Sequence, residues 1–263
     1  MMKKLLSMAT IALVGGILSC QTEDGLQPGN EVTQEALTKI RELGFNTENV
    51  QIVDGDYLVE GDIILRRREL DGSAQRRTLR IAEVEQYHTF NLVKSLPRAI
   101  TVSVSGTVST AFSNSVNNAI ARYNAQNLNI TMQRVASGGD IVIKIVNTGR
   151  YIASAGFPDS QGNPYGEVKY AKKYSNYSDG FMTTVLAHEI GHCIGFRHTD
   201  YMNRAYSCGS GGNEGQETSG VGAVHIPGTP TGPDNASWML SCLSSTTNRP
   251  FNSNDRVALD YLY

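Results

Sequence analysis

The stretch from His188 to His198 reads HEIGHCIGFRH, and it is the strongest indication of the fold in the sequence. His188 and His192 are four positions apart, so in a helix both imidazoles project from one face and can bind the same metal ion. Gly195 tolerates the positive φ that ends a helix sharply, and the turn can carry His198 to that ion. Three imidazoles leave one tetrahedral position for water, which is typical of a catalytic zinc site. We therefore predict one Zn²⁺ ion bound by these three histidines.

Glu189 follows the first of these ligands, and we predict that it is the general base. Zinc lowers the pKa of a bound water molecule to about 7, and a neighbouring carboxylate can take its proton and pass it to a leaving amine. The alternative is a helix with two surface histidines, but this accounts for neither Gly195 nor His198. The other two histidines, His88 and His225, are expected to be solvated rather than to bind metal.

The composition sets the size and the charge of the protein. The chain has 263 residues, of which 40% are hydrophobic, so one or two domains with packed cores are expected. Lys and Arg number 23 and Asp and Glu number 25, which gives a net charge of −2. A protein that binds nucleic acid without specificity needs a basic face to neutralise phosphates. We therefore expect no nucleic-acid partner.

The N-terminus has the features of an export signal. Lys3 and Lys4 precede a mostly apolar run over residues 8–19, which is shorter than the ~20 apolar residues of a membrane-spanning helix but fits a secretory signal. The residues Ile17 to Cys20 (ILSC) resemble a bacterial lipobox, in which the cysteine is lipidated. An ordinary signal peptide with an incidental cysteine is the alternative.

These features predict a signal peptide over residues 1–19 and a lipid-anchored tether over 20–30, which begins at Cys20. The chain would then be an exported bacterial lipoprotein of the outer membrane. The acidic segment 21–24 (QTED) resembles a tag for the cell surface. We expect the lipid anchor to be its only contact with a membrane.

Hydrophobic periodicity divides the remaining chain into residues 31–95 and residues 96–263. The first region is predicted to contain a helix over 31–43, strands over 50–53 and 57–65, and an arginine-rich connector over 66–95. The second is predicted to contain strands over 99–104, 129–135, 140–146, 152–157 and 167–172, helices over 110–126 and 181–195, and, after a loop-rich tail, a final helix over 253–263 capped by Ser253 or Asp255.

HExxHxxGxxH is the signature of the metzincin zinc metalloproteases, and the string HEIGH resembles the bacterial dual-action HEIGH metallopeptidase family. Metzincins carry a methionine turn beneath the zinc, and Ala236 to Leu240 (ASWML) fits that turn, with Met239 as its methionine. The resemblance covers about 97–263. It implies an α+β catalytic domain over 96–263 with a twisted mixed five-stranded sheet, two helices, a loop-rich C-terminal subdomain and a final helix.

Two positions depart from particular metzincin families. Ser241 lies where astacins have a tyrosine that binds zinc, and Thr199 follows the third histidine, where it matches none of the astacins, adamalysins or matrix metalloproteinases. Substrate preference therefore cannot be carried over. The segment 152–157 resembles the metzincin edge strand, which pairs with substrate by strand addition; an ordinary edge strand would look the same.

Residues 31–95 are predicted to be a pro-region with its connector. Val59 to Ile63 (VEGDI) resembles the astacin pro-segment pattern F-x-G-D-I, whose aspartate takes the position of the water on the zinc. The resemblance implies that Asp62 is a zinc ligand in an inactive zymogen, and that the arginines just downstream offer cleavage sites. The alternative is that these residues are only a strand end and a turn in a small accessory unit.

If Cys20 carries lipid, three cysteines remain in an oxidising environment and allow one disulfide. We expect the disulfide between Cys208 and Cys242, because both lie in the loop-rich tail, where a crosslink most reduces the entropy of the unfolded chain. Cys193 could pair with either.

The predicted function is that of a zinc-dependent endopeptidase, made as a secreted lipoprotein zymogen, which acts on protein or peptide substrates as a monomer. The main alternative is a catalytically silent surface binding protein or adhesin with the same fold. A relative without activity usually loses the general base, whereas this chain retains Glu189. A zinc hydrolase that acts on a non-peptide bond also stays open.

Overall fold

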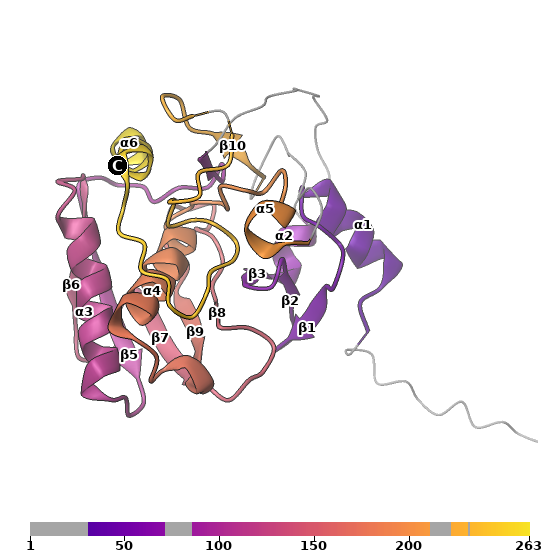
Figure 1. Ribbon diagram of the computed structural model, residues 1–263. Coiled ribbons are helices and arrows are strands. Elements are labelled where there is room, and N and C mark those ends of the chain that lie inside the picture. The colour runs from indigo at the N-terminus through magenta and orange to yellow at the C-terminus, as the bar shows by residue number, and fades with distance from the viewer. Residues whose placement is uncertain (1–30, 72–85, 211–221, 231) are drawn as a thin grey trace, which may run out of the picture. The chain divides into compact units, whose positions relative to one another are not determined.

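The computed structural model describes residues 31–71, 86–210, 222–230 and 232–263 (Figure 1). Residues 31–263 form one compact unit. The predicted signal peptide, the tether with Cys20, and the connector arginines Arg76, Arg77 and Arg80 lie outside the described residues. Among the described helices, none is both long enough and apolar enough to cross a membrane.

The N-terminal region has a small core of its own. Helix α1 (Gln34–Glu42) begins at Thr33, whose hydroxyl accepts a hydrogen bond from the Ala36 N–H, and packs its buried face on a three-stranded antiparallel sheet. The sheet is followed by a short helix, and these elements are β1 (Gln51–Val53), β2 (Asp56–Val59), β3 (Ile63–Leu65) and α2 (Arg67–Asp71).

The single strand predicted over 57–65 is wrong, because a turn divides it into β2 and β3. Glu60 and Gly61 at this turn have φ values of 56° and 93°, a left-handed conformation that an extended strand cannot contain. The turn ends with Asp62, directly before β3. The division has consequences for the site described below.

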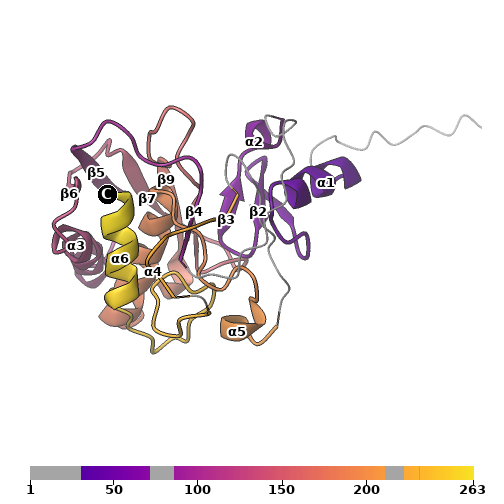
Figure 2. The ribbon, with the colours of Figure 1, turned by 90° about the horizontal axis from the view of Figure 1, so that it is seen from above.

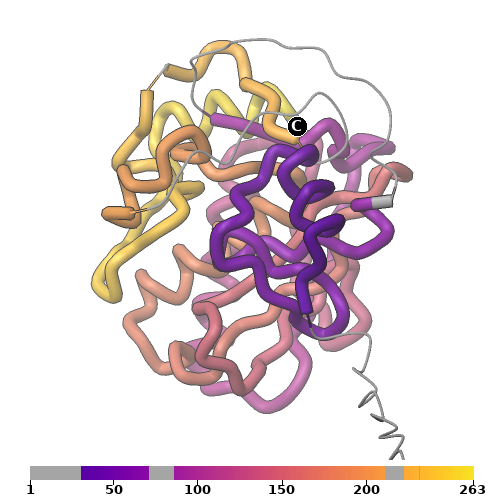
Figure 3. The backbone as a smooth tube through the Cα atoms, turned by 90° about the vertical axis from the view of Figure 1, so that its right-hand side faces the viewer, coloured from indigo at the N-terminus to yellow at the C-terminus, as the bar shows by residue number. Residues whose placement is uncertain are grey.

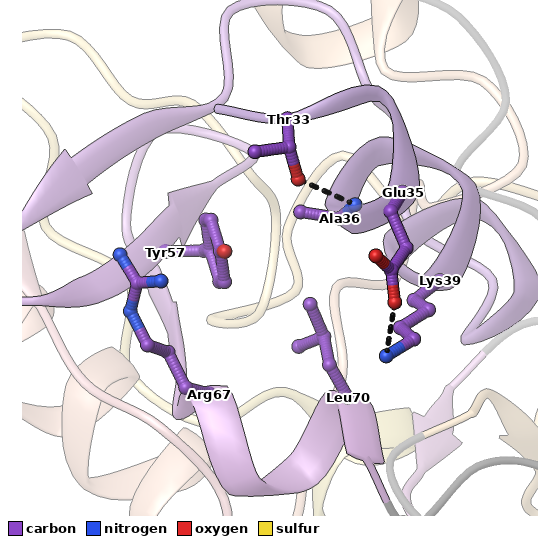
Figure 4. A pocket seen from close by; sticks show the side chains of 7 residues that line it. All are labelled: Thr33, Glu35, Ala36, Lys39, Tyr57, Arg67 and Leu70. Atoms are coloured by element: carbon purple, nitrogen blue, oxygen red, sulfur yellow. Dashed lines mark hydrogen bonds and ion pairs between the residues drawn. The ribbon is translucent and has the colours of Figure 1, made fainter. Parts of the chain in front are cut away.

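A pocket of about 220 Å³ lies between α1, α2 and β2 (Figure 4). Its charged groups already have partners, because Lys39 pairs with Glu35 and the Arg67 guanidinium lies 5.1 Å from the centre of the Tyr57 ring. None of the residues that line this pocket belongs to the HEIGHCIGFRH stretch. We therefore assign it no chemistry.

Part of the predicted connector lies among the described residues. Strand β4 (Tyr87–His88) pairs antiparallel with β10 (Val224–His225), so residues 136 positions apart meet in a second small sheet. His88 and His225 are half-buried in it rather than solvated as expected, and burial lowers the pKa of both imidazoles.

The main sheet has five strands in the order β6-β5-β7-β9-β8, and the predicted mixed five-stranded sheet is confirmed. Four strands are parallel and the edge strand β8 is antiparallel to β9. The strands are β5 (Arg98–Ser105), β6 (Ile130–Arg134), β7 (Ile141–Val146), β8 (Ala153–Ser154) and β9 (Glu167–Ala171). The predicted edge strand is thus much shorter than residues 152–157.

Two helices lie side by side on one face of this sheet (Figures 1 and 2). They are α3 (Thr110–Asn124) and α4 (Asp179–Cys193), and the 3₁₀ helix η1 (Lys172–Tyr174) leads into the second. Every residue of α4 from Phe181 to Cys193 is buried, which places the histidine-bearing helix in the main core.

The chain after His198 contains a short helix α5 (Ala205–Cys208) and the final helix α6 (Ser253–Leu262). The cap of α6 is Asn252 rather than the predicted Ser253 or Asp255. The Asn252 side chain accepts from the Asp255 N–H, and the Asp255 carboxylate accepts from the Asn252 N–H, so the two residues form a reciprocal capping box.

Candidate metal centre

Four side chains converge in the structure: Asp62, His188, His192 and His198. One potential ligand atom from each lies within 4.8 Å of those of the others. His188 and His192 come from α4, His198 from the loop that follows it, and Asp62 from the turn between β2 and β3. The structure therefore brings together the three predicted histidine ligands and the aspartate predicted from the pro-segment.

Hydrogen bonds orient two of the imidazoles. His188 donates from Nδ1 to the Trp238 carbonyl at 2.9 Å, and His192 donates from Nδ1 to the Phe196 carbonyl at 2.8 Å. A carbonyl only accepts, so each Nδ1 carries the proton and each Nε2 keeps its lone pair. Both Nε2 atoms are buried and have no hydrogen-bond partner within the described chain. Such orphaned acceptors fit a bound metal ion.

The electrostatics favour the ligand form of these histidines. Burial, reinforced by the neighbouring His188 and His198, holds the pKa of His192 well below its usual value, so the ring is neutral. Burial alone would raise the pKa of Asp62, but the charge of His198 and its contact with the carboxylate at 3.2 Å, with the nearby His188, outweigh it, and the pKa lies well below its usual value. Asp62 is therefore an anion among three imidazoles.

Two glycines let the chain approach the site closely. Gly195 has a φ of 111°, and a Cβ there would lie 2.7 Å from the Leu92 side chain. A Cβ on Gly191, the glycine of HEIGH, would lie 2.6 Å from the sulfur of Met239. The predicted turn methionine is thus completely buried against α4, in the same turn whose Trp238 carbonyl orients His188.

Glu189 lies in the same buried environment. It is 2% exposed, and its Oε2 has no hydrogen-bond partner among the residues that the structure describes. Burial and then the nearby charge of Asp62 raise its pKa well above the usual value, while His198 acts in the opposite direction. A carboxyl group with a raised pKa in a cleft has the properties of a proton carrier.

Residues 58–263 match the family model described as the dual-action HEIGH metallo-peptidase. The chain belongs to the dual-action HEIGH metallopeptidase family. A search of curated proteins finds no match. Two solved structures of myroilysin are similar to the chain. The first match has 21% sequence identity and a TM-score of 0.33, and it covers 44% of this chain and 52% of the myroilysin chain. The second has 15% identity and a TM-score of 0.44, and it covers 66% of this chain and 96% of the myroilysin chain. The chain thus spans about half the length of the first.

In this HEIGH metallopeptidase the segment around Asp62 lies along the edge of the main sheet. The Ala155 N–H donates to the Asp62 carbonyl at 3.0 Å, and the Ile64 N–H donates to the Ala155 carbonyl at 2.6 Å. The two segments form a parallel bridge between Ile63 and Ala155, just beyond β8. Figure 3 shows the N-terminal segment, in indigo, in front of the later elements.

A cavity of about 220 Å³ adjoins the cluster. Its walls come from the turn after β2, the segment before β8, helix α4 and the segment after Met239, with Asp62, Ile152, Val185, His188, Glu189 and Leu243 among the lining residues. Ser241, where astacins have a tyrosine, also lines it, but its hydroxyl donates to the buried Asp200 at 2.8 Å. The Ser241 hydroxyl is therefore used in a hydrogen bond within the protein.

The structure joins Cys208 to Cys242, the pair favoured from the sequence, and leaves Cys193 as a buried free thiol. The disulfide connects α5 to the segment after the methionine turn, and Cys242 is one of the residues that line the cavity. Burial raises the pKa of Cys193 well above its usual value, which keeps this thiol protonated on α4.

Sequence analysis missed two residues beside the cluster, Glu60 and Arg197. Their side chains are completely buried, and the Glu60 carboxylate lies 3.7 Å from the Arg197 guanidinium and 3.6 Å from Nδ1 of His198. Both were within the quoted motifs, one two positions before Asp62 and the other directly before His198. Their adjacency to predicted ligands was the available signal.

Proposed function

We propose that this HEIGH metallopeptidase is a zinc-dependent endopeptidase that is made in a latent form. The observation that supports this most directly is that the buried Nε2 atoms of His188 and His192 have no hydrogen-bond partner among the described residues and lie beside the Asp62 carboxylate. The three histidines would hold Zn²⁺, and Asp62 would be the fourth ligand of the latent chain. The donor set of imidazoles and one carboxylate is one that zinc prefers.

The zinc ion would supply a Lewis acid that polarises the scissile carbonyl group and acidifies water. Glu189 accepts a proton from the attacking water molecule while the water oxygen bonds to the carbonyl carbon. It then donates that proton to the nitrogen of the leaving amine as the C–N bond breaks. Trp238 and Phe196 hold the imidazoles through their carbonyl groups.

Latency follows from what the N-terminal segment covers. Asp62 would take the position of a nucleophilic water. Its carbonyl accepts from the Ala155 N–H and the Ile64 N–H donates to the Ala155 carbonyl, so both backbone groups that a bound peptide would need for strand addition are already used. The segment is held further by the ion pair of Asp54 with Lys169 at 2.6 Å and by Arg66 over the Tyr165 ring at 4.2 Å. Cleavage in the arginine-rich connector would release it.

We further propose that the chain is exported as a lipoprotein through the signal peptide over 1–19 and lipidation of Cys20, and that it acts at the outer membrane or the cell surface as a monomer. The support is the lipobox-like sequence ILSC and the polar tether that follows it. Labelling with radioactive palmitate tests this: the wild type should incorporate label, and Cys20→Ser should not. Equal incorporation by both proteins would exclude Cys20.

Hydrolysis of casein by the chain, cut in its connector and loaded with zinc, tests the peptidase. We expect activity that a zinc chelator abolishes and added zinc restores. Glu189→Gln should keep the zinc and the thermal stability but lose several orders of magnitude in rate, because proton removal and leaving-group protonation fail together. Near-normal activity of Glu189→Gln would exclude the proposed role of this residue.

A further inference from the structure

Glu60 adopts a backbone conformation that is unusual for a glutamate. Its φ of 56° lies in the left-handed region, which non-glycine residues enter rarely and at a cost in free energy. The side chain is completely buried, although an isolated buried carboxylate is strongly unfavourable. Such strain together with burial indicates that the position of this carboxylate matters.

The Glu60 carboxylate is held by groups on three sides. Oε1 lies 3.7 Å from Nη2 of Arg197 and accepts a hydrogen bond from the Asn46 N–H at 3.3 Å. Oε2 lies 3.6 Å from Nδ1 of His198. The Arg197 guanidinium lies 4.0 Å from the centre of the Phe45 ring. The carboxylate thus occupies a closed cation site next to the metal cluster.

The site is built from two parts of the chain that separate if the N-terminal segment is released. Glu60, Asn46 and Phe45 belong to that segment. Arg197 and His198 follow α4 and would remain. The guanidinium also lies 5.8 Å from the ring of Phe157, which is two positions beyond Ala155. The cation therefore lies beside the strand edge on which a peptide would pair.

We propose that Arg197, with Nδ1 of His198, is a recognition site for an acidic side chain of the substrate, and that Glu60 fills this site in the latent chain. The inference rests on the proposed peptidase function and names its substrate class. Glu60 is two positions from Asp62, a span of at most about 7 Å along the chain. We therefore expect the acidic residue of a substrate at most about two positions from the group that lies at the metal. A planar guanidinium matches the two oxygens of a carboxylate.

The experiment uses the full chain with a specific protease site placed within residues 72–85, which is then cut, freed of its N-terminal fragment and loaded with zinc. Paired peptides differ only by Glu in place of Gln, and the substitution is moved along the peptide one position at a time. We expect kcat/KM to favour the Glu peptide by about 10- to 100-fold at one position, the range of a charge-assisted hydrogen bond. In Arg197→Gln this ratio should fall to about 1.

Arg197→Lys keeps the charge without the planar fork and should give an intermediate ratio, and zinc content and thermal unfolding verify that each variant folds. Equal cleavage of every Glu and Gln pair by the wild type would overturn the inference and leave the peptidase proposal intact. A preference that persists in a folded Arg197→Gln would also overturn it. If no peptide is cleaved, the peptidase proposal fails, and fluorescence anisotropy of the same peptide pairs tests the recognition site by itself. Tighter binding of a Glu peptide, abolished in Arg197→Gln, would support the site. Equal binding of the Glu and Gln peptides would overturn it.

Discussion

The unfolding free energy of Asp255→Asn, compared with that of the wild type, should increase as the pH rises. Asp255 is completely buried in the first turn of α6. It accepts hydrogen bonds from the N–H groups of Asn252 and Trp238, at 3.0 and 3.3 Å, and from the Gln86 amide at 2.7 Å. The carbonyl of Trp238 in turn orients His188, so this carboxyl group supports the metal centre.

Burial raises the pKa of Asp255 to about 6, against 3.8 for an ordinary aspartate. The folded state therefore favours the protonated acid. The stability that this contributes is fully present below about pH 3.8 and is lost as the pH rises through about 6. Between pH 5 and pH 8 the wild type should lose about 1.4 kcal/mol of unfolding free energy through Asp255 alone.

Asn cannot ionise, so Asp255→Asn should not lose this contribution. Its amide nitrogen would face Gln86, whose buried Oε1 has no hydrogen-bond partner within the described chain and can accept from it if the Gln86 amide turns over. Any remaining cost of the substitution is the same at both pH values. The difference in unfolding free energy, variant minus wild type, should therefore increase by about 1.4 kcal/mol from pH 5 to pH 8.

Urea unfolding of the metal-free protein at both pH values measures this difference, because a chelator removes the pH dependence of zinc binding. Asp260→Asn is the matched control, since Asp260 is an exposed carboxylate on the same helix. A difference between variant and wild type that stays the same at pH 5 and pH 8 would refute the assignment of a raised pKa to Asp255.

Three further predictions concern the metal and the fold. His192→Ala should lose stoichiometric zinc in metal analysis, because one of three inward imidazoles is removed; retention of one ion per chain would contradict the ligand assignment. Asp62→Ala in the uncut chain should raise casein hydrolysis above that of the uncut wild type; equal latency would show that Asp62 is not the switch, and full activity of both would show that residues 31–65 are no pro-region. Cys208→Ser should lower the unfolding free energy by about 4 kcal/mol, since the disulfide closes a loop with a sequence separation of 34; urea unfolding that matches the oxidised wild type would contradict this.

The sequence by itself was enough for those parts of the site that depend on local geometry. The spacing of His188 and His192 works because a helix repeats every 3.6 residues, and Gly195 ends that helix with the positive φ expected of it. The five strands of the main sheet follow from short apolar runs in the same way. The helix repeat, the helix end and the extended conformation of each run need only interactions between residues close along the chain, whereas the pairing of the strands joins segments far apart in sequence.

The tertiary structure alone decided which distant groups meet these local elements. Asp62 and His198 are 136 positions apart, and their contact at 3.2 Å depends on how the N-terminal sheet packs on the edge of β8. The pairing of Glu60 with Arg197 and the raised pKa of Asp255 have the same origin, because burial and charge depend on everything that surrounds a group. Periodicity and spacing carry no record of such surroundings. Local sequence therefore predicted the three imidazoles, the likeness of VEGDI to a pro-segment pattern indicated Asp62, and only the packing of distant segments brought Glu60 to Arg197 and Asp62 to His198.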